Sequence, residues 1–165
     1  MAEAPHRGAI LVTGGAGYVG SHVCKALGRA GFLPVAFDNL ATGHRWAVKW
    51  GPLEIGDVRD AGLLEALMVR YRVTAVFHFA ALSLVGRSAE MPFDYYDVNV
   101  GGALALSLAM RGSGLRKLVF SSTCAVYGVP QHLPIAEDAP TLPVNVYGRT
   151  KLAAENLFCD LARAD

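Results

Sequence analysis

The stretch VTGGAGYVGSH, residues 12–22, places Gly14, Gly17 and Gly20 between an apolar run and an amphipathic segment. The run AILVT (9–13) predicts a buried strand, and residues 18–31 predict a helix that Gly31 closes. In this spacing the first glycine allows a tight turn, the second lets a pyrophosphate approach the backbone, and the third lets helix and sheet pack closely. The helix N-terminus adds free N–H groups and positive dipole. The stretch therefore predicts a dinucleotide site; the alternative is a glycine-rich turn without a ligand.

The rest of the chain repeats this alternation of short apolar runs and longer amphipathic segments. Because the runs are continuously apolar, they are typical of parallel strands covered on both faces. We expect an α/β fold, a doubly wound parallel sheet of Rossmann type with at least five strands and helices on both faces. Further strands are predicted at 33–38, 53–57, 75–81 and 117–122, and further helices at 61–72 (N-capped by Asp60), from Pro92 to about 111, and from Asn145 onward.

Composition limits the class of protein. The 165 residues are 53% hydrophobic and 18% charged with a net charge of +1, which favours one globular domain and excludes a disordered chain. No basic run indicates nucleic-acid binding, and no apolar run is long enough for a membrane span. Without an apolar signal core near the N-terminus, a cytoplasmic protein is expected. The three cysteines are too far apart for a recognisable metal site and are expected to be buried, reduced thiols.

Carboxylates close the second and third predicted strands. Asp38 lies where a carboxylate bonds the two ribose hydroxyls of NAD and repels the 2′-phosphate of NADP, so the sequence favours NAD. Asp57 either accepts from the adenine amino group or only starts the next turn, and spacing does not decide between these. Phe79 and Ala80 lie at the end of the fourth strand, where a small residue lets a cofactor lie against the sheet edge. His78 is interpreted as a core residue without chemistry.

Tyr147 and Lys151 are four residues apart and therefore share a helix face. A tyrosine serves as a base near neutral pH only if its pKa falls by a few units, and a nearby ammonium together with the positive nicotinamide ring would favour the phenolate. Thr123, at the end of the fifth predicted strand, is placed to bond the same substrate hydroxyl. An exposed Tyr–Lys pair and a strand-ending Thr are the alternative; a dinucleotide site on the same sheet favours the catalytic interpretation.

From about Ile10 onward the chain resembles the extended short-chain dehydrogenase/reductase family, and within it the UDP-glucose 4-epimerases. The motifs that carry the resemblance are VTGGAGYVGSH, DNLATGHR, GDVRD, VFHFAAL, YYDVNVGG, FSSTCAVYG and VYGRTKLAAEN. The resemblance implies NAD-dependent interconversion of UDP-glucose and UDP-galactose. In that reaction Tyr147 removes the 4-hydroxyl proton, hydride leaves C4 for NAD, and hydride returns to the other face of the 4-keto sugar. Thr123 would occupy the family's catalytic Ser/Thr position. The implied NAD contacts are Gly14, Gly17, Tyr18, Val19, Asp38, Asn39, Asp57, Val58, Phe79, Ala80, Asn99 and Lys151.

The sequence also departs from the pattern of these epimerases. Ser83 stands where many have lysine, and Val146 stands where proline often precedes the tyrosine. Residues 1–165 are expected to form an NAD-binding domain without the family's second domain, which grips the UDP-sugar, so this chain alone is expected to bind NAD weakly and not to turn over. The resemblance also implies a homodimer through helices at 91–111 and 145–164.

Two related activities and one inactive role remain to be weighed. Cys124 and Ala125 follow Thr123 where a nucleotide-sugar dehydratase of the same family carries an acid pair, so a dehydratase is disfavoured. A nucleotide-sugar reductase that releases its cofactor stays open, as does an NAD-binding module without activity.

Overall fold

The computed structural model describes residues 6–164 of the chain. Their contacts divide into two compact units, which are described separately. The first unit comprises Met1–Ala80 and Ala105–Ser121, and the second comprises Ala81–Leu104 and Ser122–Asp165. The first contains the sheet and the glycine-rich turn, whereas the second contains the segments with Thr123, Tyr147 and Lys151.

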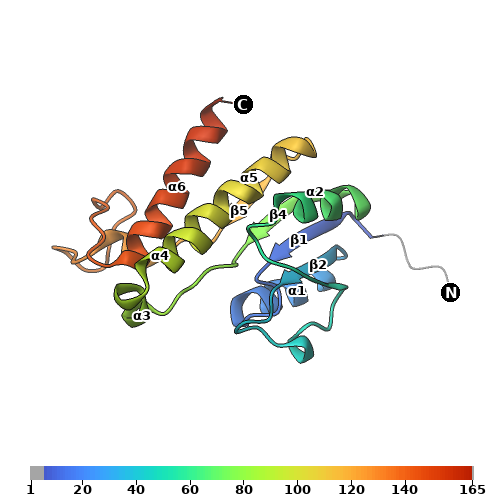
Figure 1. Ribbon diagram of the computed structural model, residues 1–165, viewed down its shortest axis with the longest axis horizontal. Helices are drawn as coiled ribbons and strands as arrows, with labels where there is room; N and C mark the ends of the chain where they lie inside the picture. Colours follow the sequence, from blue (N-terminus) through green and yellow to red (C-terminus); the bar gives the residue numbers. More distant parts are fainter. Residues whose placement is uncertain (1–5, 165) are drawn as a thin grey trace. The chain divides into compact units, whose positions relative to one another are not determined.

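The first unit is built on one parallel sheet with the strand order β3-β2-β1-β4-β5 (Figure 1). In the central strand Leu11 pairs with Val35 on one side and with Val76 on the other. This order, with strand 1 in the centre and the chain returning outward on each side, confirms the predicted doubly wound fold. The strands are β1 Ala9–Thr13, β2 Leu33–Asp38, β3 Leu53–Ile55, β4 Val73–His78 and β5 Leu118–Phe120.

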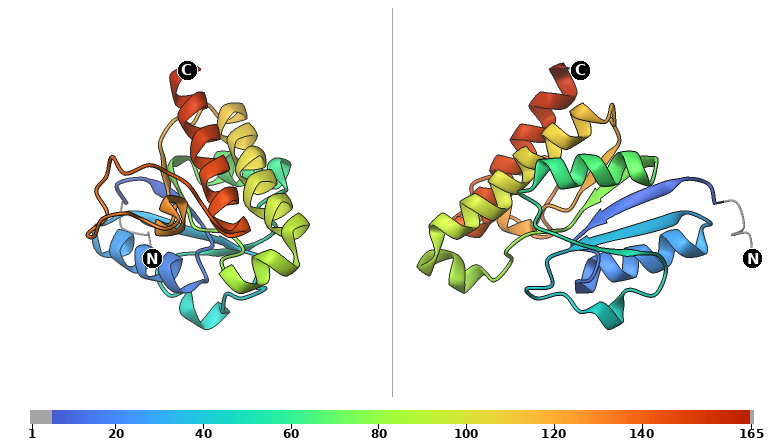
Figure 2. Two further views of the ribbon diagram at one scale, coloured as in Figure 1. Left: turned by 90° about the vertical axis from the view of Figure 1, so that its left-hand side faces the viewer. Right: turned by 45° about the vertical axis from the view of Figure 1, so that its right-hand side comes forward.

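Helices α1 (Tyr18–Arg29) and α2 (Ala61–Arg70) lie on opposite faces of this sheet (Figure 2). Ile10 and Val12 of β1 pack with Cys24 of α1, whereas the intervening Leu11 points to the other face and is also fully buried. The sheet thus has a hydrophobic layer on each side, as its continuously apolar strands predicted.

Helix ends follow the local signals in the sequence. Asp60 caps α2, because its carboxylate accepts a hydrogen bond from the Leu63 N–H at 2.9 Å. Gly31, with φ of +81°, follows α1 in a left-handed conformation that glycine adopts without strain.

Three strands are shorter or shifted relative to prediction: β3 ends at Ile55, β4 runs from Val73 only to His78, and β5 spans three residues. After β4 the apolar run continues through Phe79 and Ala80 beyond the last paired residue, so hydrogen bonding rather than hydrophobicity sets the end of that strand.

Gly62 offers a direct test of the helix assignment. It lies exposed in the first turn of α2, and a Cβ there would meet only the Asp60 carboxylate, at 3.6 Å. Gly62→Ala is therefore expected to stabilise the protein by about 0.5–1 kcal/mol, because alanine loses less backbone entropy in a helix. Urea unfolding measures the change; a destabilised Gly62→Ala would contradict the description of this turn.

The second unit is largely helical. The helix predicted from Pro92 to about residue 111 is present as one continuous helical segment that ends at Gly112, with a π-helical turn inside it. The helix α4 (Pro92–Tyr95) leads into a π-helical turn η2 (Tyr96–Gly101), and α5 (Gly102–Gly112) continues into the first unit. Two elements were not predicted, α3 (Val85–Glu90) and a 3₁₀ turn η3 (Cys124–Tyr127). The last helix, α6 (Val146–Ala164), begins as predicted after Asn145, whose side-chain oxygen accepts from the Gly148 N–H at 2.7 Å.

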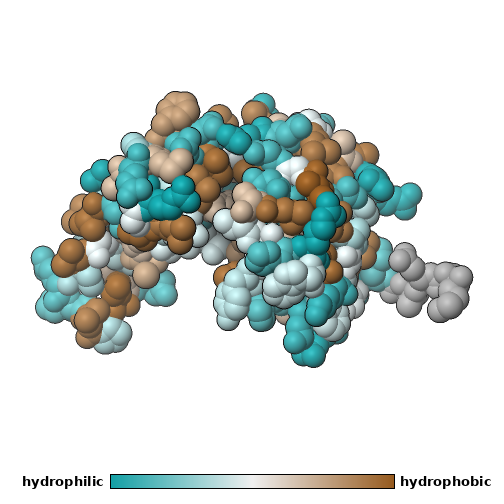
Figure 3. Space-filling model, turned by 60° about the horizontal axis from the view of Figure 1, so that its bottom comes forward, coloured by the Kyte–Doolittle hydropathy of each residue, from teal (hydrophilic) through white to brown (hydrophobic). Residues whose placement is uncertain are grey.

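Apolar side chains are also exposed in both units, among them Trp46 in the first and Phe93 in the second. Figure 3 shows hydrophobic residues, in brown, interspersed with hydrophilic ones, in teal, on one face of the molecule. No helix within residues 6–164 combines the length and the apolarity that crossing a bilayer requires.

Candidate functional site

The turn between β1 and α1 contains the three glycines of the predicted dinucleotide motif, and packing requires glycine at two of them. Gly14 has φ of +71°, and a Cβ there would lie 2.7 Å from the backbone nitrogen of Ala80. A Cβ on Gly20 would overlap the Gly14 carbonyl oxygen, whereas one on Gly17 would lie 3.2 Å from that same oxygen and meet nothing else nearby. Gly14 and Gly20 are thus required by packing inside the protein, and Gly17 borders open space.

The N-terminus of α1 suits an anion. Gly17 caps the helix without a side-chain hydrogen bond, and the first turn carries no acidic residue. Tyr18 and Val19 are exposed there, so the free N–H groups and the positive dipole end of the helix face an accessible surface. This geometry fits the pyrophosphate of a dinucleotide.

Asp38 closes β2 and is 8% exposed. One carboxylate oxygen accepts from the Ala16 N–H at 3.0 Å and the other from the Leu40 N–H at 2.8 Å. The side chain therefore fixes the glycine-rich turn to the loop after β2. A carboxylate has about four acceptor positions, so these two bonds leave capacity for two ribose hydroxyls.

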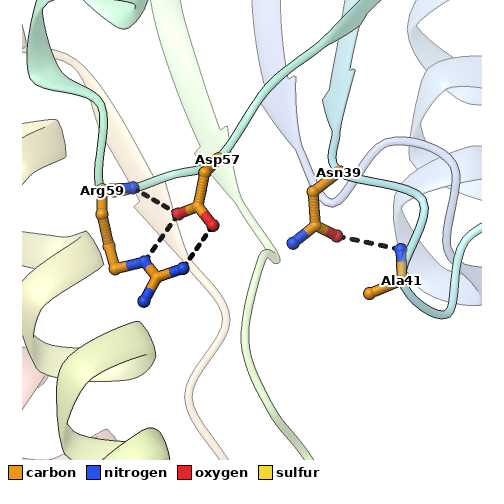
Figure 4. A network of polar contacts seen from close by, with 4 residues as sticks. All are labelled: Asn39, Ala41, Asp57 and Arg59. Carbon is orange, nitrogen blue, oxygen red and sulfur yellow. Dashed lines mark hydrogen bonds and ion pairs between the residues drawn. The ribbon is translucent and has the colours of Figure 1, made fainter.

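Asn39 and Asp57 follow the neighbouring strands β2 and β3 (Figure 4). The Asn39 side-chain oxygen accepts from the Ala41 N–H at 3.0 Å. Asp57 accepts from both the backbone N–H and the guanidinium of Arg59, which holds the pKa of this carboxyl below its usual value. The turn-forming role left open for Asp57 is thus present, and the carboxylate is charged at neutral pH. Val58, between Asp57 and Arg59, is buried.

In the second unit Thr123 and Tyr147 lie within hydrogen-bond reach of each other through their hydroxyls. Thr123 ends the segment after β5 and caps η3, accepting from the Ala125 N–H at 3.2 Å. Tyr147 is half-buried in the first turn of α6, with its ring edge-on to that of Tyr95 at 6.5 Å. Two separate segments therefore bring two hydroxyls close to each other.

The protein's own groups shift the pKa of Tyr147 upward, whereas the downward shift predicted for a base includes the positive nicotinamide ring. Burial of the phenol raises it above its ordinary value of 10, and the Thr123 hydrogen bond only partly opposes this. The expected contribution of the Lys151 ammonium is not among the causes of the shift. The protein's own groups thus favour the neutral phenol.

Lys151 lies one turn further along α6 and is 3% exposed. Burial of its ammonium lowers its pKa from 10.5 to about 8, opposed by the charge of Glu155. Below pH 8 the charged form still dominates, so an ammonium is present on this face of α6 at neutral pH.

The lowered pKa of Lys151 makes stability depend on pH. Between pH 8 and 10.5 the unfolded chain binds more protons at this residue than the folded chain, so its contribution to folding stability rises with pH. We expect a gain of about 2 kcal/mol between about pH 7.5 and about pH 10 relative to Lys151→Met, which cannot titrate. Urea unfolding of both proteins without cofactor measures this gain. Burial also raises the pKa of Cys24, to about 11, but its pH-dependent contribution is the same in both proteins and cancels in the comparison. A stability difference between the two proteins that stays constant across this pH range would mean that burial does not lower the pKa of Lys151.

Asn99, a predicted NAD contact, lies buried in η2 with its side chain engaged inside the protein. Its amide accepts from the Leu82 N–H at 2.8 Å and donates to the Leu82 carbonyl at 3.0 Å. It also donates to the Thr150 hydroxyl at 3.0 Å. Thr150 is a functional candidate that the sequence did not reveal, because only the tertiary contact distinguishes it from its neighbours on α6.

Two further predicted NAD contacts lie at the carboxyl end of β4. Phe79 and Ala80 follow β4 in the first unit, and the Phe79 N–H donates to the Thr13 carbonyl at 2.9 Å. His78 is a core residue, as interpreted, with its Nδ1 at 2.6 Å from the Thr13 hydroxyl.

The expectation that all three cysteines are buried was wrong. Cys24 is buried, whereas Cys124 and Cys159 are exposed, because η3 and the outer face of α6 leave them at the surface. Among residues 6–164 no group of three or more His, Cys, Asp or Glu side chains is placed to hold a metal ion.

The parallel sheet and the glycine-rich turn after its central strand define a Rossmann-like α/β domain. The chain belongs to the NAD dependent epimerase/dehydratase family, whose model matches residues 10–165.

Individual relatives narrow the comparison. The chain is 47% identical to UDP-glucose 4-epimerase of Rhizobium leguminosarum bv. trifolii, an alignment that covers 92% of this chain and 46% of that protein. It is also similar to the crystal structure of UDP-glucose 4-epimerase from Brucella ovis in complex with NAD, with 48% identity and a TM-score of 0.93 over 95% of this chain and 48% of that one. The enzyme from Stenotrophomonas maltophila with bound NAD and formylated UDP-arabinopyranose gives 42% identity and a TM-score of 0.93, covering 96% and 49%. The chain thus spans about half the length of these relatives.

Proposed function

We propose that this chain forms the NAD-binding part of a UDP-glucose 4-epimerase. The observation that carries the proposal is the pairing of the Thr123 hydroxyl with the hydroxyl of Tyr147, which lies on α6 one turn before the buried Lys151. The similarity to epimerases at 47–48% identity supports it. UDP-sugars are the proposed substrates, in carbohydrate metabolism, and a cytoplasmic homodimer is part of the same proposal.

The first unit would hold NAD. The N-terminus of α1, with Gly14, Gly17, Tyr18 and Val19, would take the pyrophosphate, and Asp38 the adenosine ribose. Asp38 already orients the turn through Ala16, so the same carboxylate would bind the ribose and fix the loop that binds the phosphates. Because it is an anion without a compensating Arg bonded to it, it favours NAD over NADP. The further proposed contacts in this unit are Asn39, Asp57, Val58, Phe79 and Ala80, and those proposed from the second unit are Asn99 and Lys151.

Tyr147 would exchange the proton of the sugar 4-hydroxyl. The Thr123 hydroxyl fixes the phenol oxygen, and the Lys151 ammonium favours a negative charge near this helix face. When bound, NAD supplies the acceptor and donor of hydride at sugar C4 and a positively charged ring. Since burial raises the pKa of Tyr147, the neutral phenol is its resting state, and positive charge is needed for it to act as a base.

The test uses the protein at its natural full length with UDP-galactose and NAD. The proposal predicts conversion to UDP-glucose, measured by chromatography of the nucleotide sugars, without accumulation of NADH in proportion to product. Stoichiometric NADH would indicate a dehydrogenase or reductase. NAD binding without any UDP-sugar conversion would contradict the proposed activity.

A further inference from the structure

Thr150 occupies the position just before Lys151 on α6 and is fully buried. Its hydroxyl donates to the carbonyl oxygen of Tyr147 at 2.8 Å and accepts from the Asn99 side-chain amide at 3.0 Å. One buried hydroxyl thus bonds the turn that carries Tyr147 and Lys151 to a residue of the π-helical turn η2. π-Helical turns are rare and frequently occur at functional sites.

The partner of this hydroxyl is itself held in place. The Asn99 amide bonds both the N–H and the carbonyl of Leu82, which fixes the orientation of the amide plane. The remaining N–H of the amide then points to Thr150. The chain of bonds runs from the backbone of Leu82 through Asn99 to the first turn of α6, and every contact lies within the second unit.

A hydroxyl here is not needed to fill space. Valine has nearly the same shape, and a threonine hydroxyl that bonds back to its own helix slightly destabilises that helix. The hydroxyl is favourable only because Asn99 pairs with it, and its removal would leave a buried amide N–H without an acceptor. The arrangement therefore specifies a geometry more than it adds stability.

We infer that Thr150 is a positioning residue that sets the rotation of the first turn of α6 through Asn99, and so keeps Tyr147 at Thr123 and Lys151 buried. The inference rests on the proposed function, since it assigns Thr150 to the same proton-transfer site. In this role Thr150 does not touch the reacting sugar; it acts through Tyr147 and Lys151 on the same turn of α6. Small misplacements of a catalytic group cost large factors in rate, so the effect is expected mainly in kcat.

The test compares Thr150→Val, which keeps the shape, with Thr150→Ser, which keeps the hydroxyl, in the protein at its natural full length. Thr150→Val is expected to lower kcat at least about tenfold with KM within about threefold, and Thr150→Ser to stay within about threefold of the parent in both. Ala154→Gly is the control for simple destabilisation, because Ala154 is fully buried on the same helix outside this network. It is expected to lower Tm while retaining kcat. Wild-type kcat in Thr150→Val, or an equal loss in Ala154→Gly at matched Tm, would overturn the inference.

A second readout does not depend on activity. In the protein without cofactor, amide hydrogen exchange at Leu82 is expected to be faster in Thr150→Val and unchanged in Ala154→Gly and Thr150→Ser. Only Thr150→Val removes the hydroxyl that bonds the Asn99 amide, and this amide accepts from the Leu82 N–H. Unchanged exchange in Thr150→Val would overturn the inference. If the parent protein converts no UDP-sugar, the proposed function fails, and the Leu82 exchange still decides whether Thr150 positions this turn.

Discussion

Tyr147→Phe is expected to lower kcat for UDP-galactose conversion by roughly 10²–10⁴-fold while NAD stays bound. The substitution removes only the hydroxyl, and the ring keeps its edge contact with Tyr95. Under the proposed function this hydroxyl exchanges the proton of the sugar 4-hydroxyl, so the variant loses the group that carries the proton. Initial rates with saturating UDP-galactose, together with fluorescence of bound cofactor, measure the two properties separately.

The matched control for this variant is Tyr96→Phe. Tyr96 is an exposed tyrosine in η2 of the same unit, and its loss of a hydroxyl should leave kcat within about twofold. Near-normal turnover by Tyr147→Phe would show that another group carries the proton and would remove the basis of the catalytic assignment.

Gly20→Ala is expected to destabilise the protein by about 2–3 kcal/mol and to weaken NAD binding by roughly 100-fold. The added methyl group would overlap the Gly14 carbonyl oxygen and lie 2.9 Å from the Gly15 Cα. Since both neighbours are backbone atoms, the turn itself must move, and α1 with it. Urea unfolding and an NAD titration followed by calorimetry measure the two effects.

Gly17→Ala separates folding from binding. Its methyl group would lie 3.2 Å from a single backbone oxygen, so stability should change by less than about 1 kcal/mol. The same methyl group would occupy the space through which a pyrophosphate approaches α1, and NAD affinity should fall at least about tenfold. Equal NAD affinity in Gly17→Ala and the parent would place the phosphates elsewhere.

Most of the fold was predictable because it depends on local patterns. The continuous apolar runs identified the five strands, and Asp60 and Asn145 marked helix starts that the structure confirms through their cap bonds. The π-helical turn η2 within the predicted 92–111 helix was not predictable. It is linked to the burial of Asn99 and its bonds to Leu82 and Thr150, and these are tertiary contacts that no periodicity records.

The candidate site, too, was predictable where it depends on local spacing and not where it depends on tertiary packing. The spacing of the glycines and of Tyr147 and Lys151 is local, so the sequence could indicate it. The upward shift of the Tyr147 pKa could not be predicted from the sequence, because burial of the phenol, its largest cause, depends on the packing of α6 and η3. The role of Thr150 was missed for the same reason, since its partner lies 51 residues away.

The measurement that tests the central claim most directly follows the hydrogen at sugar C4. UDP-galactose carrying deuterium at C4 is incubated with the full-length protein and NAD in ordinary water, and the UDP-glucose formed is analysed by mass spectrometry and NMR. The account predicts UDP-glucose that retains deuterium at C4, because only the hydroxyl proton passes through Tyr147. Product that has exchanged its C4 deuterium for solvent hydrogen would contradict it.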